Sequence, residues 1–213
     1  MIHRLSYKRM NQTDHTKQRL LDASRKLFAD NGFDGASVRA ITRLADANLG
    51  AVTYHFGSKD GLYAAVLQQL FASLGNRVSS AAARAAPTRQ RLEAIVHAFF
   101  AFFEQYPEAP RLLIRHLAST GVPPEAAVRQ FRRVPEAIIA VVREGQGRGE
   151  LRAMEPLLVA FSLISQAVWF AVIRRAMAQV TGLPMDRPEM AAVIEQHIID
   201  VIGRLVEPAK ASA

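Results

Sequence analysis

A short stretch near the N-terminus, residues 48–56, concentrates side chains that can bond to a nucleic acid. If residues 49–55 form a short helix, Val52 and Phe56 are four residues apart and share its buried face. The outward face then carries Asn48, Gly50, Ala51, Thr53, Tyr54 and His55. A glycine there permits close approach of the backbone, small side chains pack on thymine methyl groups, and Tyr54 and His55 reach phosphates or base edges. This stretch is the candidate DNA-contacting surface.

Three further candidate residues, Ser37, Arg39 and Lys59, lie at expected helix starts, where free amide groups and the helix dipole attract phosphate. Ser58 is expected to cap the helix that follows it, and Lys59 falls in the first turn of that helix. Ser37 is expected to cap a helix that runs to Ala45, and Arg39 adds a cation near its start. These residues suit contacts with a phosphate backbone. Periodicity alone favours an ordinary alternative, in which Tyr54 and Phe56 are core residues and Arg39 and Lys59 lie on a solvated face. Both interpretations stay open at this point.

The chain offers little that could support catalysis or hold a metal. It has no cysteine, which excludes disulfides, cysteine nucleophiles and thiolate metal sites. His97 and His116 are nineteen positions apart without an acidic companion at ligand spacing, and there is no His-Glu-x-x-His pattern. There is also no glycine-rich phosphate loop after a strand. We therefore expect a protein that is not an enzyme and that uses no cofactor and no metal.

The composition is that of a basic globular chain. It has 213 residues, of which 50% are hydrophobic, and a formal net charge of +8 at pH 7. This charge favours a polyanionic partner without requiring one. The N-terminal residues lack the apolar core of a secretory signal. The longest uncharged run, 156–173, is at the lower limit for a membrane span, but a helix buried at a subunit interface has the same composition. We expect a cytoplasmic protein with no membrane partner.

Helical periodicity runs through almost the whole chain, so the predicted fold class is all-α, with about nine helices. Serine caps, glycine stops and prolines near helix starts define the expected bounds. The expected helices are 16–31, 37–45, 49–55, 58–83, 88–105, 107–119, 124–145, 156–178 and 188–206. We divide the chain into a flexible basic arm (1–15), a small head (16–60) and a larger helical body (61–213), with the helix from about 58 connecting head and body.

The head contains two short helices joined by a tight turn at residues 46–48 and braced by a preceding helix, which describes a helix-turn-helix. Its sequence includes LFADNGF at 27–33, SVRAI at 37–41 and GAVTYHFGSKDGLY at 50–63. In this order and spacing, the stretch 16–67 resembles the DNA-binding head of the TetR family of bacterial transcriptional regulators. About 50 residues carry the resemblance, which makes it highly specific.

The resemblance implies a homodimer that binds double-stranded operator DNA, with 49–55 as recognition helix and a body that binds a small-molecule effector and forms the dimer. By position, the implied DNA contacts are Ser37, Arg39, Asn48, Leu49, Gly50, Ala51, Thr53, Tyr54, His55 and the phosphate clamp Lys59. Two residues depart from the family pattern. Thr53 replaces a common aromatic residue, and Asp46 stands where the turn usually has glycine. Aspartate tolerates a left-handed backbone better than most residues, so we expect the turn to form.

The last two helices are so apolar that one small body cannot bury both, which favours a self-complementary interface. The predicted dimer residues are Phe161, Ile164, Val168, Ile194, Ile198, Val201 and Leu205. The ligand site is less defined by the sequence, and an aromatic lining with a few polar groups would suit a hydrophobic or aromatic effector. Its predicted residues are His97, Phe100, Phe103, Arg115, His116, Gln166 and Trp169. The same residues are also typical of ordinary core, interhelical and surface positions.

Two functional hypotheses follow. The first is a ligand-responsive regulator of transcription, a repressor, released from a palindromic operator by its inducer. The second is a helical small-molecule-binding or protein-interaction module that has lost DNA recognition, for which Asp46 and Thr53 are the only support. The basic arm carries Arg4, Lys8 and Arg9. Either these side chains lie along the minor groove beside the head, or the arm takes no part in DNA binding.

Overall fold

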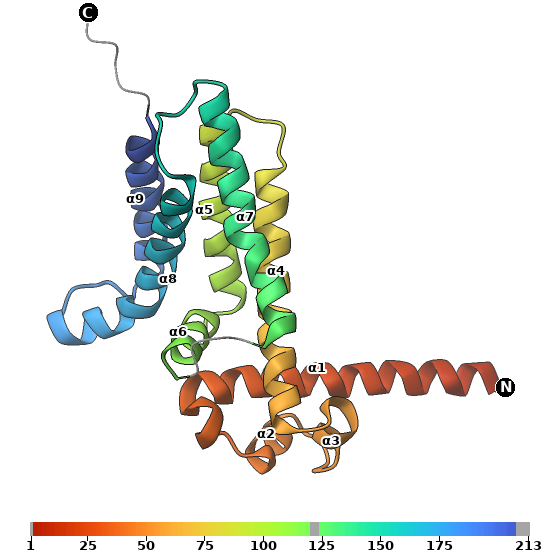
Figure 1. Cartoon of the computed structure of the whole chain (residues 1–213). Helices are drawn as coiled ribbons and strands as arrows, with labels where there is room; N and C mark the ends of the chain where they lie inside the picture. Colours follow the sequence, from red (N-terminus) through yellow and green to blue (C-terminus); the bar gives the residue numbers. More distant parts are fainter. Residues whose placement is uncertain (1, 120–123, 208–213) are drawn as a thin grey trace, which may run out of the picture. The chain divides into compact units, whose positions relative to one another are not determined.

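A computed structural model describes residues 2–119 and 124–207, without the side chains of 2–13, 117 and 119. The described residues form nine helices and no strand, which confirms the all-α prediction (Figure 1). The helices are α1 (Ile2–Gly35), α2 (Val38–Leu44), α3 (Ala51–Phe56), α4 (Lys59–Ala82), α5 (Thr88–Gln105), α6 (Ala109–Ser119), α7 (Glu125–Gly147), α8 (Pro156–Thr181) and α9 (Pro188–Val206). Most predicted bounds agree within a few residues, because caps and prolines are local signals.

The first helix differs most from its prediction. Helical backbone begins at Ile2 rather than after Thr16, so the expected flexible arm lies within α1. Residues 2–15 contain neither glycine nor proline, so nothing local ends the helix there. The side chains of the arm's Arg4, Lys8 and Arg9 lie outside the described residues, and their role in DNA binding stays a prediction. At the other end, Gly32 interrupts the helix with φ 74°, as a glycine stop should.

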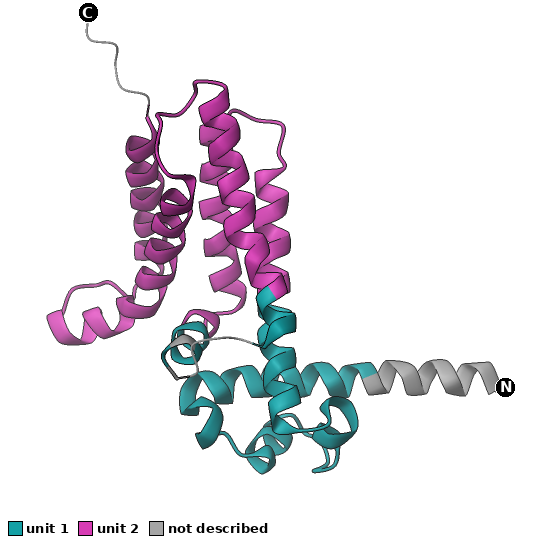
Figure 2. Ribbon diagram, in the orientation of Figure 1, with its two compact units in different colours: residues 1–70, 111–128 teal, residues 71–110, 129–213 magenta. Residues whose placement is uncertain are grey.

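The chain divides into two compact units (Figure 2). Unit 1 comprises residues 1–70 and 111–128, and unit 2 comprises 71–110 and 129–213. The sequence placed the boundary at residue 60, whereas the units divide inside α4. Because α4 is one continuous helix, no linker marks that boundary in the sequence. The segment that contains α6 belongs to unit 1, although it follows α5 in the chain.

Unit 1 is the head. In it α1 packs against both α2 and α3, and α2 packs against α3 (Figure 1). Each helix contributes apolar side chains at helical spacing to one core. The fully or almost fully buried members of this core are Leu20, Phe28, Ile41, Val52, Leu62 and Val66. The prediction for Leu44 is wrong. Helical periodicity predicts that this side chain faces inward, but it is 55% exposed at the C-terminal end of α2.

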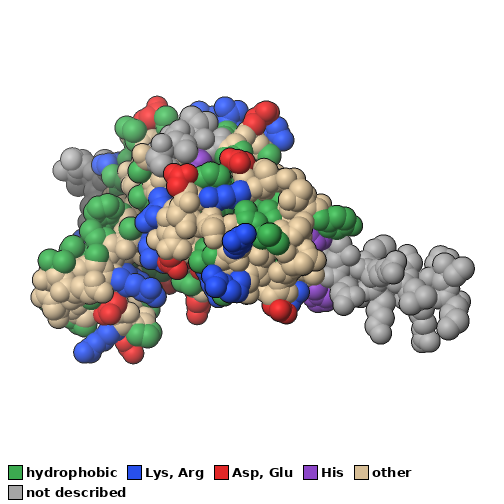
Figure 3. Space-filling model, turned by 90° about the horizontal axis from the view of Figure 1, so that it is seen from below, with side chains coloured by type: hydrophobic (Ala, Val, Ile, Leu, Met, Phe, Trp, Pro, Cys, Tyr) green, Lys and Arg blue, Asp and Glu red, His purple; other side chains and the backbone are tan. Residues whose placement is uncertain are grey.

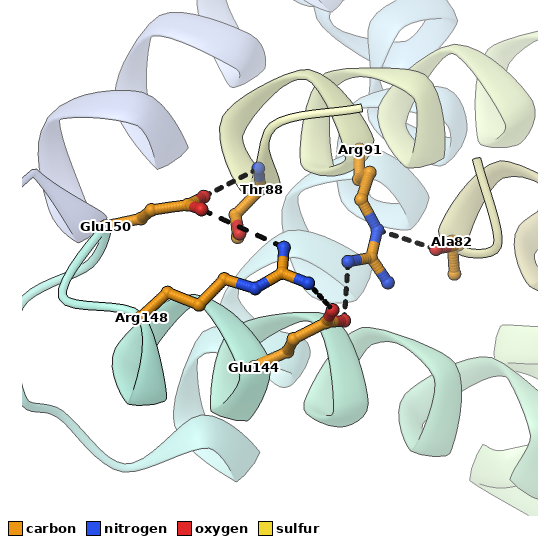
Figure 4. Close-up of polar contacts among 6 residues, drawn as sticks. All are labelled: Ala82, Thr88, Arg91, Glu144, Arg148 and Glu150. Atoms are coloured by element: carbon orange, nitrogen blue, oxygen red, sulfur yellow. Dashed lines mark hydrogen bonds and ion pairs between the residues drawn. The ribbon is translucent and has the colours of Figure 1, made fainter. Parts of the chain in front are cut away.

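Unit 2 is the body, in which α5 packs against α8 and α9, and α8 against α9. A network of charged side chains ties the start of α5 to the end of α7 (Figure 4). Glu150 accepts a hydrogen bond from the backbone amide of Thr88, at 2.9 Å. Glu144 pairs with Arg91 and with Arg148, each at 2.6 Å. The Glu150 carboxylate thus satisfies a free amide in the first turn of α5, although the two residues are 62 positions apart.

One helix among the described residues, α8, is long and apolar enough to cross a membrane by length and composition alone. This is weak evidence, because the core helix of a soluble protein has the same properties. Its buried side chains lie between Val159 and Val168, and they face other helices of the body. That the protein has no membrane partner therefore stays a prediction.

Candidate nucleic-acid interface

The helix-turn-helix is built by local capping interactions that the sequence predicts. Ser37 caps α2 by accepting a hydrogen bond from the amide of Ala40, at 3.1 Å. The chain then turns at Asp46, whose φ is 47°. After α3, Gly57 adopts φ 76° and Ser58 caps α4 by accepting from the amide of Gly61, at 3.0 Å. These caps fix where α3 and α4 begin, and so they position the candidate contact residues.

On α3, Thr53 and Tyr54 of the predicted outward face are exposed, His55 is half-buried and Ala51 is buried. Tyr54 is 79% exposed and Thr53 is exposed beside it, whereas Val52 is buried. The ring of His55 meets that of Tyr54 edge to face, with centroids 4.9 Å apart. Ala51 is only 6% exposed, because it faces the core of the head with Val52. It therefore offers little surface to a thymine methyl group, and its role as a DNA contact stays a prediction.

The remaining predicted contacts surround α3. Asn48, Leu49 and Gly50 are exposed in the turn that leads into the helix. Ser37 and Arg39 are exposed at the start of α2. Figure 3 looks at the molecule from the side on which α2 and α3 lie in Figure 1, and lysine and arginine side chains are mixed there with aspartate and glutamate side chains. The cationic side chains on this side suit contacts with a polyanion.

Lys59, the predicted phosphate clamp, is the first residue of α4 and is half-buried. Its Nζ lies 4.5 Å from the centre of the Phe33 ring. It is also 3.5 Å from the backbone oxygen of Asp34, at the outer limit of a hydrogen bond. The contact between Lys59 and Phe33 is not predictable from the sequence, because nothing local links residues that are 26 positions apart.

Behind Lys59 lies a cluster of aromatic rings. Phe33 and Tyr63 meet at a centroid distance of 5.2 Å, and the fully buried Phe28 contacts both rings. The Tyr63 hydroxyl is hydrogen-bonded to Nδ1 of His116 in α6, at 2.9 Å. Burial raises the pKa of Tyr63 to about 12, so the hydroxyl keeps its proton at neutral pH. His116 is only 3% exposed and belongs to the core of unit 1.

A second contact between residues far apart in the sequence supports the turn. Nη1 of Arg19, in α1, lies 3.1 Å from a carboxylate oxygen of Asp46. The ion pair joins α1 to the position where the backbone adopts a left-handed conformation. Both side chains are largely solvated, so the pair contributes only modestly to stability. The turn forms as predicted, with aspartate in the place of glycine.

Comparison with known families accounts for most of the chain. The family described as "Bacterial regulatory proteins, tetR family" matches residues 20–66, which include all of α2 and α3. The family described as "Tetracyclin repressor-like, C-terminal domain" matches residues 89–202. The second match alone covers more than half of the chain. The protein belongs to the TetR family.

Several TetR-family relatives match over most of their length. The transcriptional repressor NicS of Pseudomonas putida is 26% identical, over 76% of this chain and 78% of that protein. The transcriptional activator FasR of Mycolicibacterium smegmatis is 31% identical, over 73% of each chain. The repressor DhaR of a Mycobacterium species is 28% identical, over 80% of this chain and 87% of that protein. These relatives are transcriptional regulators, and the chain is a regulator of transcription rather than an enzyme.

Solved TetR structures share the fold. A bacterial regulatory protein from Rhodococcus RHA1 superposes with a TM-score of 0.73 at 17% identity, covering 92% of this chain and 98% of that one. PfmR from Thermus thermophilus superposes with a TM-score of 0.71 at 22% identity, covering 87% and 97% of the two chains. The head and the helical body thus have the architecture of TetR regulators.

The predicted dimer residues are only partly exposed in this TetR chain. Phe161 is 48% exposed, and Val201 and Leu205 are half-buried. The other four are buried within one chain, because α8 and α9 pack against each other and against α5. These four leave little surface for a partner, and their place in the interface stays a prediction: Ile164, Val168, Ile194 and Ile198. A helix with apolar residues on most sides does not show by its sequence which side faces its own chain.

The predicted ligand residues are divided between the two units. Arg115 and His116 belong to unit 1, and the other five belong to unit 2: His97, Phe100, Phe103, Gln166 and Trp169. Several are already engaged. Nδ1 of His97 lies 2.6 Å from a carboxylate oxygen of Glu195, and Gln166 donates to the backbone oxygen of Ser162 at 3.1 Å. A ligand role for these residues stays a prediction.

Proposed function

We propose that this TetR regulator is a homodimer that binds a palindromic operator through α3 and is released from it by a small hydrophobic or aromatic effector. The observation that carries the proposal is the exposed polar face of α3, inside a head that matches the family. Thr53 and Asn48 lie where base contacts are expected, and changes there alter sequence preference. Tyr54, His55 and Lys59 suit phosphates, which position the head without selecting a sequence.

The dimer is supported by apolar side chains that one chain leaves exposed. On α8, Leu158, Phe161 and Trp169 lie on one stripe at helical spacing, and they are 64%, 48% and 57% exposed. Val193, at 57%, adds an exposed apolar side chain on α9. An apolar stripe of this size is costly in water and suits a two-fold interface in which the same surface contributes from each copy.

The proposed mechanism is a shift between two spacings of the paired heads. A dimer that binds a palindrome needs its recognition helices about 34–36 Å apart, which is one turn of DNA. An effector that binds better to a wider dimer favours that state, and the operator is then released. Aromatic side chains on α5, among them the half-buried Phe100 and Phe103, favour a hydrophobic or aromatic effector.

We propose that the protein represses transcription rather than activating it. NicS and DhaR are repressors, whereas FasR is an activator, so the relatives include both signs. A regulator of this kind works in the cytoplasm, where the operator is. Expression of a reporter behind the protein's own promoter, with and without the regulator gene, decides the sign.

The alternative function is a small-molecule-binding or protein-interaction module without DNA recognition. Asp46 and Thr53 favour it only as departures from the family pattern, and the turn around Asp46 is well formed. A mobility-shift assay with DNA from upstream of the protein's own gene separates the two. Retardation at low salt supports the regulator, and its absence at micromolar protein supports the module.

Lys59→Ala tests the clamp assignment. The variant should weaken binding to every DNA sequence and reduce the slope of log affinity against log salt by about one for each head, because each phosphate contact releases roughly one counterion. The matched control is Arg143→Ala, which removes one positive charge from the exposed face of α7. If both variants bind DNA as the parent does, with the same salt slope, Lys59 is not a phosphate clamp.

A further inference from the structure

Lys59 does not extend freely into solvent. Its ammonium group lies over the face of Phe33, 4.5 Å from the ring centre, where the negative face of the ring attracts a cation. The backbone oxygen of Asp34, 3.5 Å away, adds a second weak attraction. Both groups belong to the end of α1 that follows the break at Gly32, whereas Lys59 opens α4. The side chain is therefore held at one place by a different helix.

The ring that holds Lys59 is itself fixed. Phe33 packs against Phe28, with centroids 6.0 Å apart, and against Tyr63, at 5.2 Å. Phe28 is fully buried, and Tyr63 is anchored by its hydrogen bond to the buried His116. Aromatic pairs at these distances have preferred relative orientations. Phe33 and Tyr63 are thus the partly exposed members of a cluster whose other two members, Phe28 and His116, are buried.

The backbone that carries Phe33 is fixed as well. Gly32 adopts φ 74°, and Arg115 of α6 lies so close that a Cβ on this glycine would be 2.9 Å from Nη1 of the arginine. Next to it, Arg111 of α6 pairs with Asp30 at 2.7 Å. Two arginines from α6 therefore lie against the C-terminal end of α1, where the helix dipole favours cations. Phe33 is thus held at its ring by Phe28 and Tyr63, and at its backbone by the contacts of α6 with Gly32 and Asp30.

We propose that Phe33 is a positioning residue for DNA binding, which holds the Lys59 ammonium group in place before DNA arrives. The inference rests on the proposed clamp role of Lys59. A lysine side chain loses much conformational freedom when it is fixed on a phosphate, and a side chain that is already held loses less on binding. The contact with a neutral ring leaves the full positive charge of Lys59 available for phosphate.

An ordinary core role for Phe33 makes a different prediction. In that case a replacement affects the melting temperature and leaves the DNA affinity of the folded protein unchanged. Phe33→Leu removes the ring and keeps an apolar side chain of related size. Phe33→Tyr keeps the ring and is the matched control. Phe33→Met fills the space flexibly without a ring and is the second variant if leucine does not fold.

The experiment measures binding of the full-length protein to a labelled mixed-sequence DNA duplex over a range of salt concentrations. Because a phosphate clamp acts on all sequences, the operator need not be known. Phe33→Leu should weaken binding about two- to fivefold for each head, the effect of a solvent-accessible cation–π contact. Its salt slope should stay that of the parent, because no charge is lost. Phe33→Tyr should bind as the parent does.

A double-mutant cycle with Lys59→Ala completes the test. In the Lys59→Ala background, Phe33→Leu should have no further effect on affinity, because the side chain that it positions is absent. The inference is overturned if Phe33→Leu binds as tightly as the parent or more tightly, or if its effect is the same in both backgrounds. If Lys59→Ala alone changes neither affinity nor salt slope, the clamp itself is wrong, which is a separate result.

Discussion

Single residues of the head show how backbone conformation limits the choice of side chain. Asp46 is the one non-glycine residue with positive φ in the part of the chain that the structure describes. Aspartate is tolerated there because its short polar side chain costs less in the left-handed region than others do. Its carboxylate also faces Arg19. The residue therefore replaces a turn glycine at low cost.

Two substitutions of Asp46 test this account. Asp46→Val should lower the free energy of unfolding by about 1–2 kcal/mol, because a β-branched residue is strained at positive φ. Asp46→Gly should change it by less than about 0.5 kcal/mol, since the relieved backbone offsets the lost solvated ion pair and the added freedom of the unfolded chain. Denaturant titrations of the two variants and the parent measure the difference. Equal effects of valine and glycine would rule out backbone conformation as the cause.

At the scale of helices, the junction between α3 and α4 depends on close approach of two backbones. A Cβ on Gly61 would overlap with the backbone carbonyl oxygen of Phe56. Any side chain at this position pushes α3 away from the first turn of α4. The recognition helix and Lys59 would then lose their relative placement, since they lie on the two sides of this junction.

Gly61→Ala should accordingly lower the free energy of unfolding by roughly 2 kcal/mol or more and weaken DNA binding. Gly147→Ala is the control, because a Cβ there meets nothing within 4 Å and alanine favours the end of α7. Thermal unfolding and a DNA-binding titration of both variants test the expectation. A Gly61→Ala protein as stable as the parent would contradict it.

The charged network of the body gives an expected pH dependence. Thr88, through its hydroxyl and its backbone amide, lowers the pKa of Glu150 below its ordinary value of 4.5, and Arg91 lowers that of Glu144 through a hydrogen bond. In this case the unfolded chain binds protons more readily than the folded one. The stabilisation is therefore present above pH 4.5 and is lost as pH falls through the lowered pKa values.

Glu150→Gln measures the part that depends on the Glu150 charge. The variant should be less stable than the parent at neutral pH, and the difference should shrink as the pH falls below 4.5. Glu136→Gln, on the exposed face of α7, should show a much smaller difference at every pH. Denaturation midpoints at several pH values decide between them. A Glu150→Gln difference that is independent of pH would exclude the ionised carboxylate as its source.

At the scale of the whole molecule, the exposed stripe on α8 predicts the oligomeric state. Trp169→Glu should yield a monomer at micromolar protein, because a charge on the apolar stripe of the proposed interface is costly to bury. Leu44→Glu places the same charge on an exposed leucine of the head and should leave the dimer intact. Sedimentation analysis measures the mass of each variant. A monomeric parent under the same conditions would refute the dimer.

The sequence by itself determined the helices and the helix-turn-helix. Ser37, Ser58 and Gly32 act through bonds and backbone angles within a few residues, so their effects are readable from local order. The tertiary structure alone decided which faces are buried. Leu44 is exposed and Ala51 buried, and α9 turns Ile194 and Ile198 into its own chain. Likewise, Phe33 meets Lys59 and His116 meets Tyr63 only after folding. Burial and such contacts depend on residues far apart in the chain, and a helical period shows that a face is apolar without showing what covers it.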